Sequence, residues 1–413
     1  MKIVVALDSF KGSLTAVQAC NIVAGAIRSA VPQAEVVTKP MADGGEGTAS
    51  VLMAAAGGQW ISTTVMGPLP DMEVEAGFVW LPDNRTALVE MATASGLPLV
   101  RPEQRNPLRT TTYGTGQLIK AALGHGANHI LLAIGGSATV DGGVGAAMAL
   151  GWKFLTNRGQ EVGCGGGELA QIAKIVPPVR SVPVRASPRR ASIPARLKEV
   201  VRGRTTYEET PHGVTTNVTV EVLCDVDNPL CGEHGAARVY GPQKGATPEM
   251  VEQLDAGLAH LARVVKEQLG RDIACLPGAG AAGGLAAGAV AFMGARLVPG
   301  IDAIMSQTRL AEAVAGADWV VTGEGSFDEQ SLRGKVVSGV TRVARAAGAK
   351  IAVCAGQVRL APERYRQAGI EAAVACMEAG MKLDYAIAHS AELLDGAARR
   401  FAREYLSEKE TGP

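Results

Sequence analysis

The chain has 413 residues, of which 47% are apolar and only 4% aromatic, and its 40 basic side chains balance 40 acidic ones. A neutral balance gives no field that attracts nucleic acid or an anionic membrane, so we expect neither as a partner. The length predicts two or three domains. Seven scattered cysteines without a C-x-x-C pair, no signal-peptide pattern and no long apolar run predict a soluble cytoplasmic protein.

The first sixty residues alternate between strand and helix patterns. Residues 2–7, KIVVAL, are apolar throughout, as in a strand buried on both faces, and residues 35–41 predict a second strand. Thr15 and Gln18 form a capping-box pattern at the start of the helix between them. A short helix after the second strand is expected to end near Gly57. This alternation predicts a parallel α/β sheet with functional loops at the carboxyl ends of its strands.

The middle and the end of the chain follow different patterns. Residues 72–81 and 86–92 flank a PDNR turn and predict a β-hairpin. A helix within 112–123 and a strand at 129–136 follow. Parallel character returns with strands predicted at 318–325, 350–356 and 371–377, helices near 301–315, 335–347 and 361–368, and a last helix over 391–406. We therefore predict one α/β domain built from 1–62 and 296–408, with a mixed α/β domain inserted over 63–295.

A proline-rich segment interrupts the inserted domain. Residues 176–213 carry six prolines and eight Lys or Arg against three Glu, without a sustained apolar period. This composition is more typical of a mobile surface loop than of a nucleic-acid or membrane contact.

Five loops combine glycine with polar or charged residues, and each is predicted to follow a strand: 8–13, 43–48, 135–143, 278–284 and 322–328. Backbone N–H groups in such loops favour anions, as does the dipole of a following helix. Four of the loops also carry Asp or Glu. Carboxylates repel phosphates unless Mg²⁺ bridges them, so the combination predicts a site for a metal and a nucleotide.

Two familiar nucleotide-binding motifs would indicate other classes of enzyme. No GxxxxGK[ST] occurs, which excludes a P-loop enzyme. Residues 278–283 match GxGxxG, and Asp302 lies about twenty residues further on, so a nicotinamide-dependent dehydrogenase of a small hydroxy acid is an alternative. The segment after that motif, RLVPGID, is a poor strand, which argues against it.

Nine motifs in a fixed order resemble those of bacterial glycerate kinases: DSFKGSLTA, MADGGEGT, RNPLRTTTYGTGQLI, GGSATVDGG, CDVDNPL, GPQKGAT, PGAGAAGG, PGID and TGEGSFDEQSLRGK. The resemblance covers nearly the whole chain. It implies a flavodoxin-like domain interrupted by a second α/β domain, and ATP-dependent phosphorylation of D-glycerate, usually to 2-phosphoglycerate. Val140, Ser326 and Phe327 depart from the family pattern, and Val140 leaves a non-catalytic nucleotide sensor as a further alternative.

Phosphoryl transfer needs alignment and charge neutralisation, and residues of these loops are candidates for both tasks. Lys11 is predicted to neutralise the transferring phosphoryl group, and Asp8 to orient Lys11 or hold Mg²⁺. Asp43 and Glu46 are the predicted metal ligands. The predicted nucleotide and phosphate contacts are Gly44, Gly45, Gly47, Thr48, Gly280 and Gly283.

The acceptor needs a cation for its carboxylate and a base for its hydroxyl. Arg109 and Arg333 are predicted to bind the carboxylate, because an arginine fork matches it. Asp141 and Asp225 compete as the general base, ahead of three other carboxylates. The predicted neighbours of the substrate are Thr111, Thr112 and Ser137. The sequence leaves the oligomeric state open.

Overall fold

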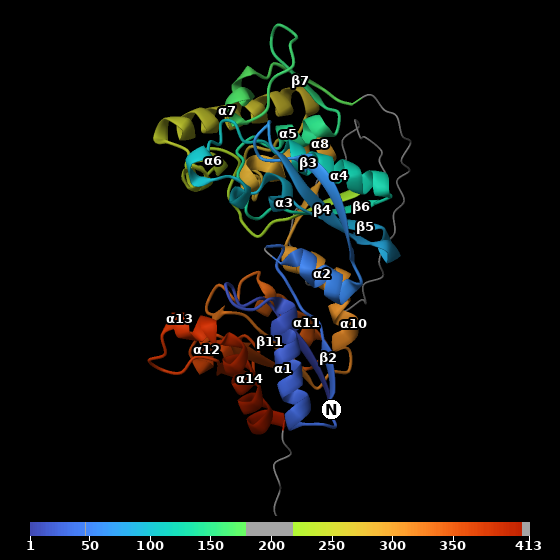
Figure 1. Ribbon diagram of the computed structural model, residues 1–413, viewed down its shortest axis with the longest axis vertical. Coiled ribbons are helices and arrows are strands. Elements are labelled where there is room, and N and C mark those ends of the chain that lie inside the picture. The colour runs from blue at the N-terminus through green and yellow to red at the C-terminus, as the bar shows by residue number, and fades with distance from the viewer. Residues whose placement is uncertain (46, 179–217, 407–413) are drawn as a thin grey trace, which may run out of the picture.

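The computed structural model describes residues 1–45, 47–178 and 218–406. Two predictions fall outside these ranges: Glu46 as a metal ligand, and residues 179–213 of the proline-rich segment as a surface loop. The described residues form two lobes stacked end to end, each built around a β-sheet (Figure 1). The predicted α/β class is confirmed.

The lower lobe in Figure 1 contains a five-stranded sheet with the order β15-β13-β11-β1-β2, in which every pair is parallel. Its strands come from both ends of the chain: β1 Lys2–Leu7, β2 Glu35–Thr38, β11 Trp319–Gly323, β13 Lys350–Ala355 and β15 Ala372–Ala375. The strands predicted there are confirmed. β2 is shorter than predicted and ends before Pro40, which has no N–H to donate.

Helices cover both faces of this sheet, and β1 shows why. Ile3, Val5 and Leu7 belong to one apolar cluster, whereas Val4 and Ala6 belong to another. Successive residues of a strand face opposite sides of the sheet, so a strand between two helical layers must be apolar throughout. The helices of this lobe are α1 Ala16–Ala30, α10 Leu310–Val314, α11 Val336–Ala346, α12 Pro362–Gln367, α13 Leu383–Ala388 and α14 Ser390–Phe401.

Local signals set the start of α1. Gln18 N donates to Thr15 Oγ1 at 3.2 Å, and Thr15 N donates to Gln18 Oε1 at 3.0 Å, which confirms the predicted capping box. The helix predicted over 301–315 is divided instead. Arg309, with φ 53°, separates α9 Gly300–Gln307 from α10, because a left-handed residue cannot continue an α-helix.

The upper lobe contains a six-stranded mixed sheet with the order β10-β9-β6-β5-β4-β3. Its strands are β3 Gln59–Met66, β4 Glu73–Leu81, β5 Thr86–Glu90, β6 His129–Ala133, β9 Thr219–Leu223 and β10 Arg296–Val298. The predicted hairpin is confirmed as β4 and β5, whereas β3 was not predicted. β3 lies at the sheet edge and pairs antiparallel with β4. The neighbouring strands β5, β6, β9 and β10 of this sheet are parallel to one another.

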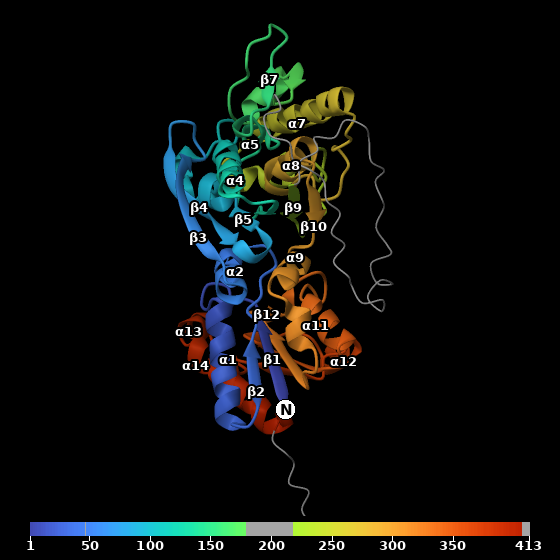
Figure 2. The same ribbon diagram turned by 90° about the vertical axis from the view of Figure 1, so that its right-hand side faces the viewer.

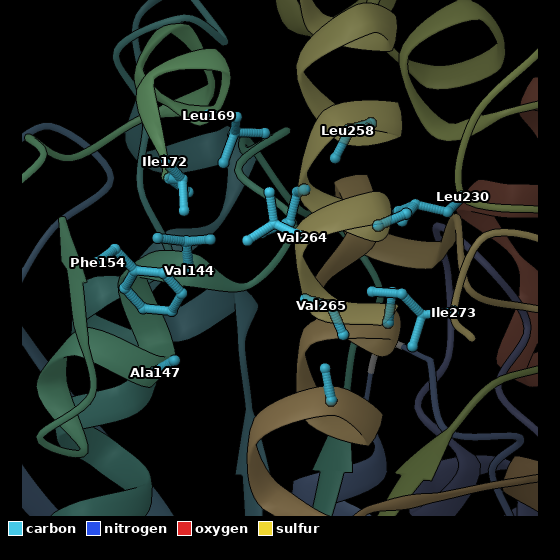
Figure 3. Packing of buried hydrophobic residues seen from close by; sticks show 14 of the residues in the cluster. Val144, Ala147, Phe154, Leu169, Ile172, Leu230, Leu258, Val264, Val265 and Ile273 are labelled. Atoms are coloured by element: carbon cyan, nitrogen blue, oxygen red, sulfur yellow. The ribbon is translucent and has the colours of Figure 1, made fainter. Parts of the chain in front are cut away.

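The longest helix of the described chain, α7 Pro248–Leu269, closes the far end of the upper lobe and was also not predicted. Leu258, Val264 and Val265 of α7 join an apolar cluster with Leu169 and Ile172 (Figure 3). The other elements of this lobe are α3 Ala92–Ser95, α4 Tyr113–His125, α5 Val144–Ala149, α6 Ala236–Tyr240, α8 Leu285–Met293 and the antiparallel pair β7 Lys153–Leu155 and β8 Lys174–Val176.

The strand pairing indicates where the boundaries between the two lobes lie along the chain. β3 begins at residue 59 and β10 begins at residue 296, and both belong to the six-stranded sheet. We propose boundaries near residues 58 and 299, a few residues from the predicted divisions at 62/63 and 295/296, because a boundary inside a paired strand would separate hydrogen-bonded partners.

Two helices lie between the sheets: α9 and α2 Thr48–Ala56 (Figure 2). Leu52 of α2 and Ile304 of α9 pack with Leu131 and Leu223 of the six-stranded sheet. The carboxyl ends of the parallel strands of both sheets face this junction (Figure 2). No helix in the described part of the chain has the length and apolar character needed to cross a membrane.

Candidate active site

Three carboxylates lie at the junction, each at the end of a strand of the five-stranded sheet. Asp8 follows β1, Asp43 follows β2, and Glu324 follows β11. Desolvation, then the charges of Asp43 and Glu324, raise the pKa of Asp8 to about 7. The N–H of Ser9, 2.6 Å from Asp8 Oδ1, lowers it only in part. The charges of these carboxylates therefore act against one another, with too few donors to balance them.

A fourth carboxylate, Asp225, reaches the same place from the other sheet. It follows β9 and keeps an exposed surface. Desolvation by the protein around it, and then the charges of Asp43 and Asp302, raise its pKa to about 6. The N–H of Gly300, which donates to Asp225 Oδ1 at 3.1 Å, lowers the pKa only in part. We call Asp8, Asp43, Asp225 and Glu324 the acidic cluster. Both lobes contribute to it.

Glycines allow the loop after β2 to pass between the lobes. A Cβ on Gly300 would lie 1.7 Å from the carbonyl oxygen of Asp43, and one on Gly44, with φ 93°, would lie 2.8 Å from Leu223 Cβ. No larger residue fits such contacts. On the other side, Gly45 Cα lies 3.8 Å from an ideal Cβ on Gly135, in the loop after β6. These contacts hold Asp43 close to Asp225.

The predicted phosphate loop is also tied to the protein itself. Asp43 Oδ1 accepts a hydrogen bond from Gly45 N at 3.1 Å, and Thr48 Oγ1 donates to Gly45 O at 2.8 Å. Thr48 is buried, and Gly47, with φ 89°, is the N-cap of α2. Glu90, at the end of β5, accepts from Ala49 N at 2.9 Å, so a protein carboxylate already occupies part of the α2 N-terminus.

The acidic cluster has two features that favour a hard cation. Its oxygen ligands are of the kind that Mg²⁺ prefers. Glu324 Oε1 is also buried without a hydrogen-bond partner, and burial raises the pKa of this carboxyl. Over residues 1–45, 47–178 and 218–406, however, no three His, Cys, Asp or Glu side chains lie close enough to hold one metal ion. The predicted ligand Glu46 lies outside those ranges.

Lys335 is a cation whose charge acts on two members of the cluster, and no role was predicted for it. It stands at the N-cap of α11, and its charge lowers the pKa values of Asp225 and Glu324. The predicted Arg333 is exposed and acts instead on Glu329. The predicted Lys11 is exposed on the loop after β1, next to Gly325 in the loop after β11.

Asp141, one of the two predicted bases, has a different environment. Its carboxylate is 1% exposed and accepts hydrogen bonds from Thr112 N at 2.7 Å, Thr112 Oγ1 at 2.9 Å and Thr111 Oγ1 at 3.3 Å. The N–H groups of Gly143 and Gly145 add 3.1 and 3.3 Å contacts. Thr111 and Thr112 thus donate to Asp141 and fix the orientation of its carboxylate. This environment suits a residue that holds the surrounding loops together better than it suits a general base.

The remaining predicted substrate residues lie at the loop after β6 and next to it. Ser137 is 7% exposed and accepts a hydrogen bond from Lys244 Nζ at 2.7 Å. Arg109 is exposed. Lys244 had no assigned role, although it stands in the GPQKGAT motif. Its burial could not be foreseen, because that depends on the loop that covers it.

The fourth glycine loop does not follow a strand, although one was predicted. Residues 278–284 come after α7 and an irregular stretch, so the strand-loop-helix context of a dinucleotide fingerprint is absent in this described region. Gly280 and Gly283, predicted to bind nucleotide, are buried. A Cβ on Gly280 would lie 2.3 Å from the carbonyl oxygen of Pro229, and one on Gly283 would lie 1.9 Å from the carbonyl oxygen of Thr139. Close packing of backbones accounts for these glycines.

Two of the departures from the family pattern lie in the core. Val140 and Phe327 are 0% exposed and belong to apolar clusters of the upper and lower lobes. Ser326 Oγ donates to Asp328 Oδ2 at 3.4 Å. None of the three belongs to the acidic cluster.

Two surface hollows lie away from the junction. One, of about 580 Å³, lies along α7 beside His260 and Gln268, and the other, of about 440 Å³, lies along α11 beside Arg342 and Arg345. Neither is lined by a residue of the acidic cluster. We place the candidate site at the junction, because the charged groups of both lobes converge there.

The comparisons with known proteins agree along the chain. The model of the glycerate kinase family matches residues 3–187 and 189–406. The chain is 42% identical over 400 residues to a glycerate kinase of Halalkalibacterium halodurans and 39% identical over 402 residues to a glycerate 2-kinase of Escherichia coli, with 97% of each chain covered. A solved Salmonella typhimurium LT2 structure described as glycerate kinase 2 matches with a TM-score of 0.80 and 37% identity, over 98% of this chain and 97% of that one. This chain belongs to the glycerate kinase family of enzymes.

Proposed function

We propose that this protein transfers the γ-phosphoryl group of ATP to the 2-hydroxyl of D-glycerate at the junction of the two lobes, giving 2-phosphoglycerate. The observation that carries the proposal is the acidic cluster, to which both lobes contribute. Phosphoryl transfer needs alignment and charge neutralisation more than covalent chemistry, and a junction can supply both when it closes on two substrates.

Asp43 and Glu324 are our proposed ligands for Mg²⁺, with Glu46 retained as a prediction. Bound Mg²⁺ would neutralise charge on the phosphates of ATP. Asp43 is the central member of the cluster, since its charge raises the pKa of Asp8, Asp225 and Glu324. Lys335 and Lys11 bring positive charge to the same side, where they would stabilise the transferring phosphoryl group.

Asp225 is our proposed general base. Its pKa of about 6 leaves it mostly ionised at neutral pH and still basic enough to accept the proton of a hydroxyl. It is exposed and belongs to the same sheet as the loop that carries Ser137, so it lies on the side that we assign to the acceptor. Asp141, by contrast, is buried and saturated with hydrogen bonds.

A coupled assay with D-glycerate, ATP and Mg²⁺ tests the reaction, and enzymatic analysis of the product distinguishes 2-phosphoglycerate from 3-phosphoglycerate. We expect ADP release that requires both D-glycerate and Mg²⁺, with glycerol as a poor substitute. Asp225→Asn should lower kcat at least about 100-fold with little change in the KM for ATP. ATP binding without ADP release would favour the sensor alternative. The cytoplasmic location stays a prediction.

A further inference from the structure

Lys244 is a buried lysine that the proposed chemistry does not use. It ends the short 3₁₀ turn Pro242–Lys244 and is 3% exposed. Its Nζ donates to Ser137 Oγ at 2.7 Å and to the carbonyl oxygen of Thr139 at 2.8 Å. Both acceptors belong to the loop after β6, whose exposed residues Gly135 and Gly136 border the junction.

The surroundings of Lys244 compensate its charge poorly. Within the described chain its printed partners are a hydroxyl and a carbonyl, and no carboxylate forms a salt bridge with it. Burial lowers its pKa to about 7, while the charge of Asp141 raises it. Arg105 packs against Gly245 beside it, and Arg238 on α6 is half-buried and paired with Glu252 and Asp255. A buried ammonium without a paired carboxylate is rare, because its desolvation is costly.

The hydrogen bond from Lys244 also determines where the Ser137 hydroxyl proton can point. A lysine donates and does not accept when charged, so Ser137 Oγ is the acceptor and its own proton is directed elsewhere. Ser137 is 7% exposed and directly follows the two exposed glycines at the junction. The hydroxyl is therefore available as a donor to an acceptor group at the edge of the junction, with the amino group of Lys244 behind it.

Two further polar groups nearby have unused hydrogen-bonding capacity. Thr139 Oγ1 and Arg105 Nε are both buried without a partner. Thr139 belongs to the same loop as Ser137, and Arg105 has its carbonyl oxygen 2.5 Å from an ideal Cβ on Gly245. Most buried polar atoms in folded proteins are satisfied, so each of these two atoms has capacity for a further hydrogen-bond partner.

Resting on the proposed function, we propose that Lys244 is the positioning residue for the carboxylate of the acceptor acid: it orients the Ser137 hydroxyl toward that carboxylate and supplies the positive charge behind it. The ligand class is a short hydroxy acid. This assignment differs from the predicted roles of Arg109 and Arg333, which are exposed side chains.

The proposal carries a definite pH dependence. A carboxylate bound at Ser137 favours the charged form of Lys244, so binding takes up a proton when the pH is near the pKa of about 7. Above that pH the free enzyme must first protonate the amine. The KM for D-glycerate should therefore rise as the pH increases through about 7, whereas the KM for ATP should not follow it.

Steady-state kinetics of Lys244→Met test the role, because methionine keeps the chain length and removes the charge. We expect the KM for D-glycerate at about pH 6.5 to rise at least about 10-fold, to lose its pH dependence, and to leave the KM for ATP within about twofold. Ser137→Ala should give a smaller rise. The double variant should add little to Lys244→Met alone, because the two side chains act as one unit.

Calorimetric binding of D-glycerate without ATP separates this proposal from the proposed function. The wild type should take up a proton on binding, measured in buffers of different ionisation enthalpy, and Lys244→Met should not. An unchanged KM with unchanged pH dependence, or equal rises in both KM values with a lower Tm, would overturn the role of Lys244. If D-glycerate produces no ADP with the wild type, the proposed function fails while proton uptake still decides the role of Lys244. Should Lys244→Met not fold, Ser137→Ala and wild-type proton uptake decide it.

Discussion

The loops after β2 and β6 each carry an aspartate among glycines, and in the sequence the two are alike. In the structure their carboxylates have opposite surroundings. Asp141, after β6, accepts hydrogen bonds from two threonines and two glycine N–H groups and is almost fully buried. Asp43, after β2, accepts one from Gly45 N, and its charge raises the pKa values of Asp8, Asp225 and Glu324.

This difference separates two ways of using a carboxylate. A buried acid with enough donors stabilises the loops that supply them, and removing it leaves those donors unsatisfied. Acids that repel one another destabilise the protein until a cation or a proton arrives. Such destabilisation is typical of functional sites. Variants at the two positions should therefore affect different measurements.

Asp43→Asn should give the largest loss of activity. We expect turnover with ATP and D-glycerate to fall at least about 100-fold, about 3 kcal/mol of transition-state stabilisation, with part recovered at high Mg²⁺. Tm should not fall, because the variant relieves repulsion. Glu329→Gln is the matched control, since Glu329 is exposed and paired with Arg364 at 2.8 Å. Near-normal turnover in Asp43→Asn would reduce Asp43 to a local acceptor for Gly45 N, because the side-chain oxygen of asparagine can accept the same hydrogen bond.

Asp141→Asn should show the reverse pattern. In the variant an amide nitrogen replaces one carboxylate oxygen of Asp141 and cannot accept from the N–H and O–H donors around it. We therefore expect a loss of about 2 kcal/mol in the free energy of unfolding. Turnover per folded molecule should stay within about threefold of the wild type at low temperature. Thermal denaturation and assays on the same preparation measure both quantities. A 100-fold loss of turnover at unchanged Tm would instead support Asp141 as the general base.

The smallest expected effect is on the pH dependence of stability. The folded-state pKa values of Asp8, about 7, and Asp225, about 6, lie above the ordinary value of 3.8. Between about pH 4 and 7 the folded state therefore binds more protons than the unfolded state. As the pH rises through that window, these two groups lower the stability of the folded protein. In the absence of Mg²⁺, the fall in Tm from about pH 5 to pH 8 should be steeper for the wild type than for Asp43→Asn.

Adding Mg²⁺ at about pH 8 completes this test. A cation that binds the folded cluster raises Tm by mass action, and the rise should be smaller in Asp43→Asn. The comparison between the two proteins cancels the titration of every group outside the cluster. Equal pH profiles with and without Asp43 would mean that the four carboxylates do not interact in solution.

The sequence itself contained much of the local structure of both lobes. The apolar run of β1, the capping box of α1 and the β4–β5 hairpin were all predicted and confirmed, because each depends on residues within a few positions of one another. Helix α7 was not predicted, although it has local signals: Thr247 as N-cap and apolar residues at helical spacing. β3 is different: its exposed, mixed side chains make a strand only by pairing with β4.

For the site, the sequence determined which residues have the right chemistry, and the tertiary structure decided which of them meet. Asp8, Asp43 and Asp225 were candidates from their loops, and the junction brings them together. Asp141, an equal candidate, is enclosed by hydrogen-bond donors from a distant loop. Lys244 bonds to Ser137 and Thr139 of a loop far away in sequence, and the charge of Lys335 acts on the equally distant Asp225. Desolvation and hydrogen bonding set what a charged group can do, and both depend on neighbours that only the folded chain supplies.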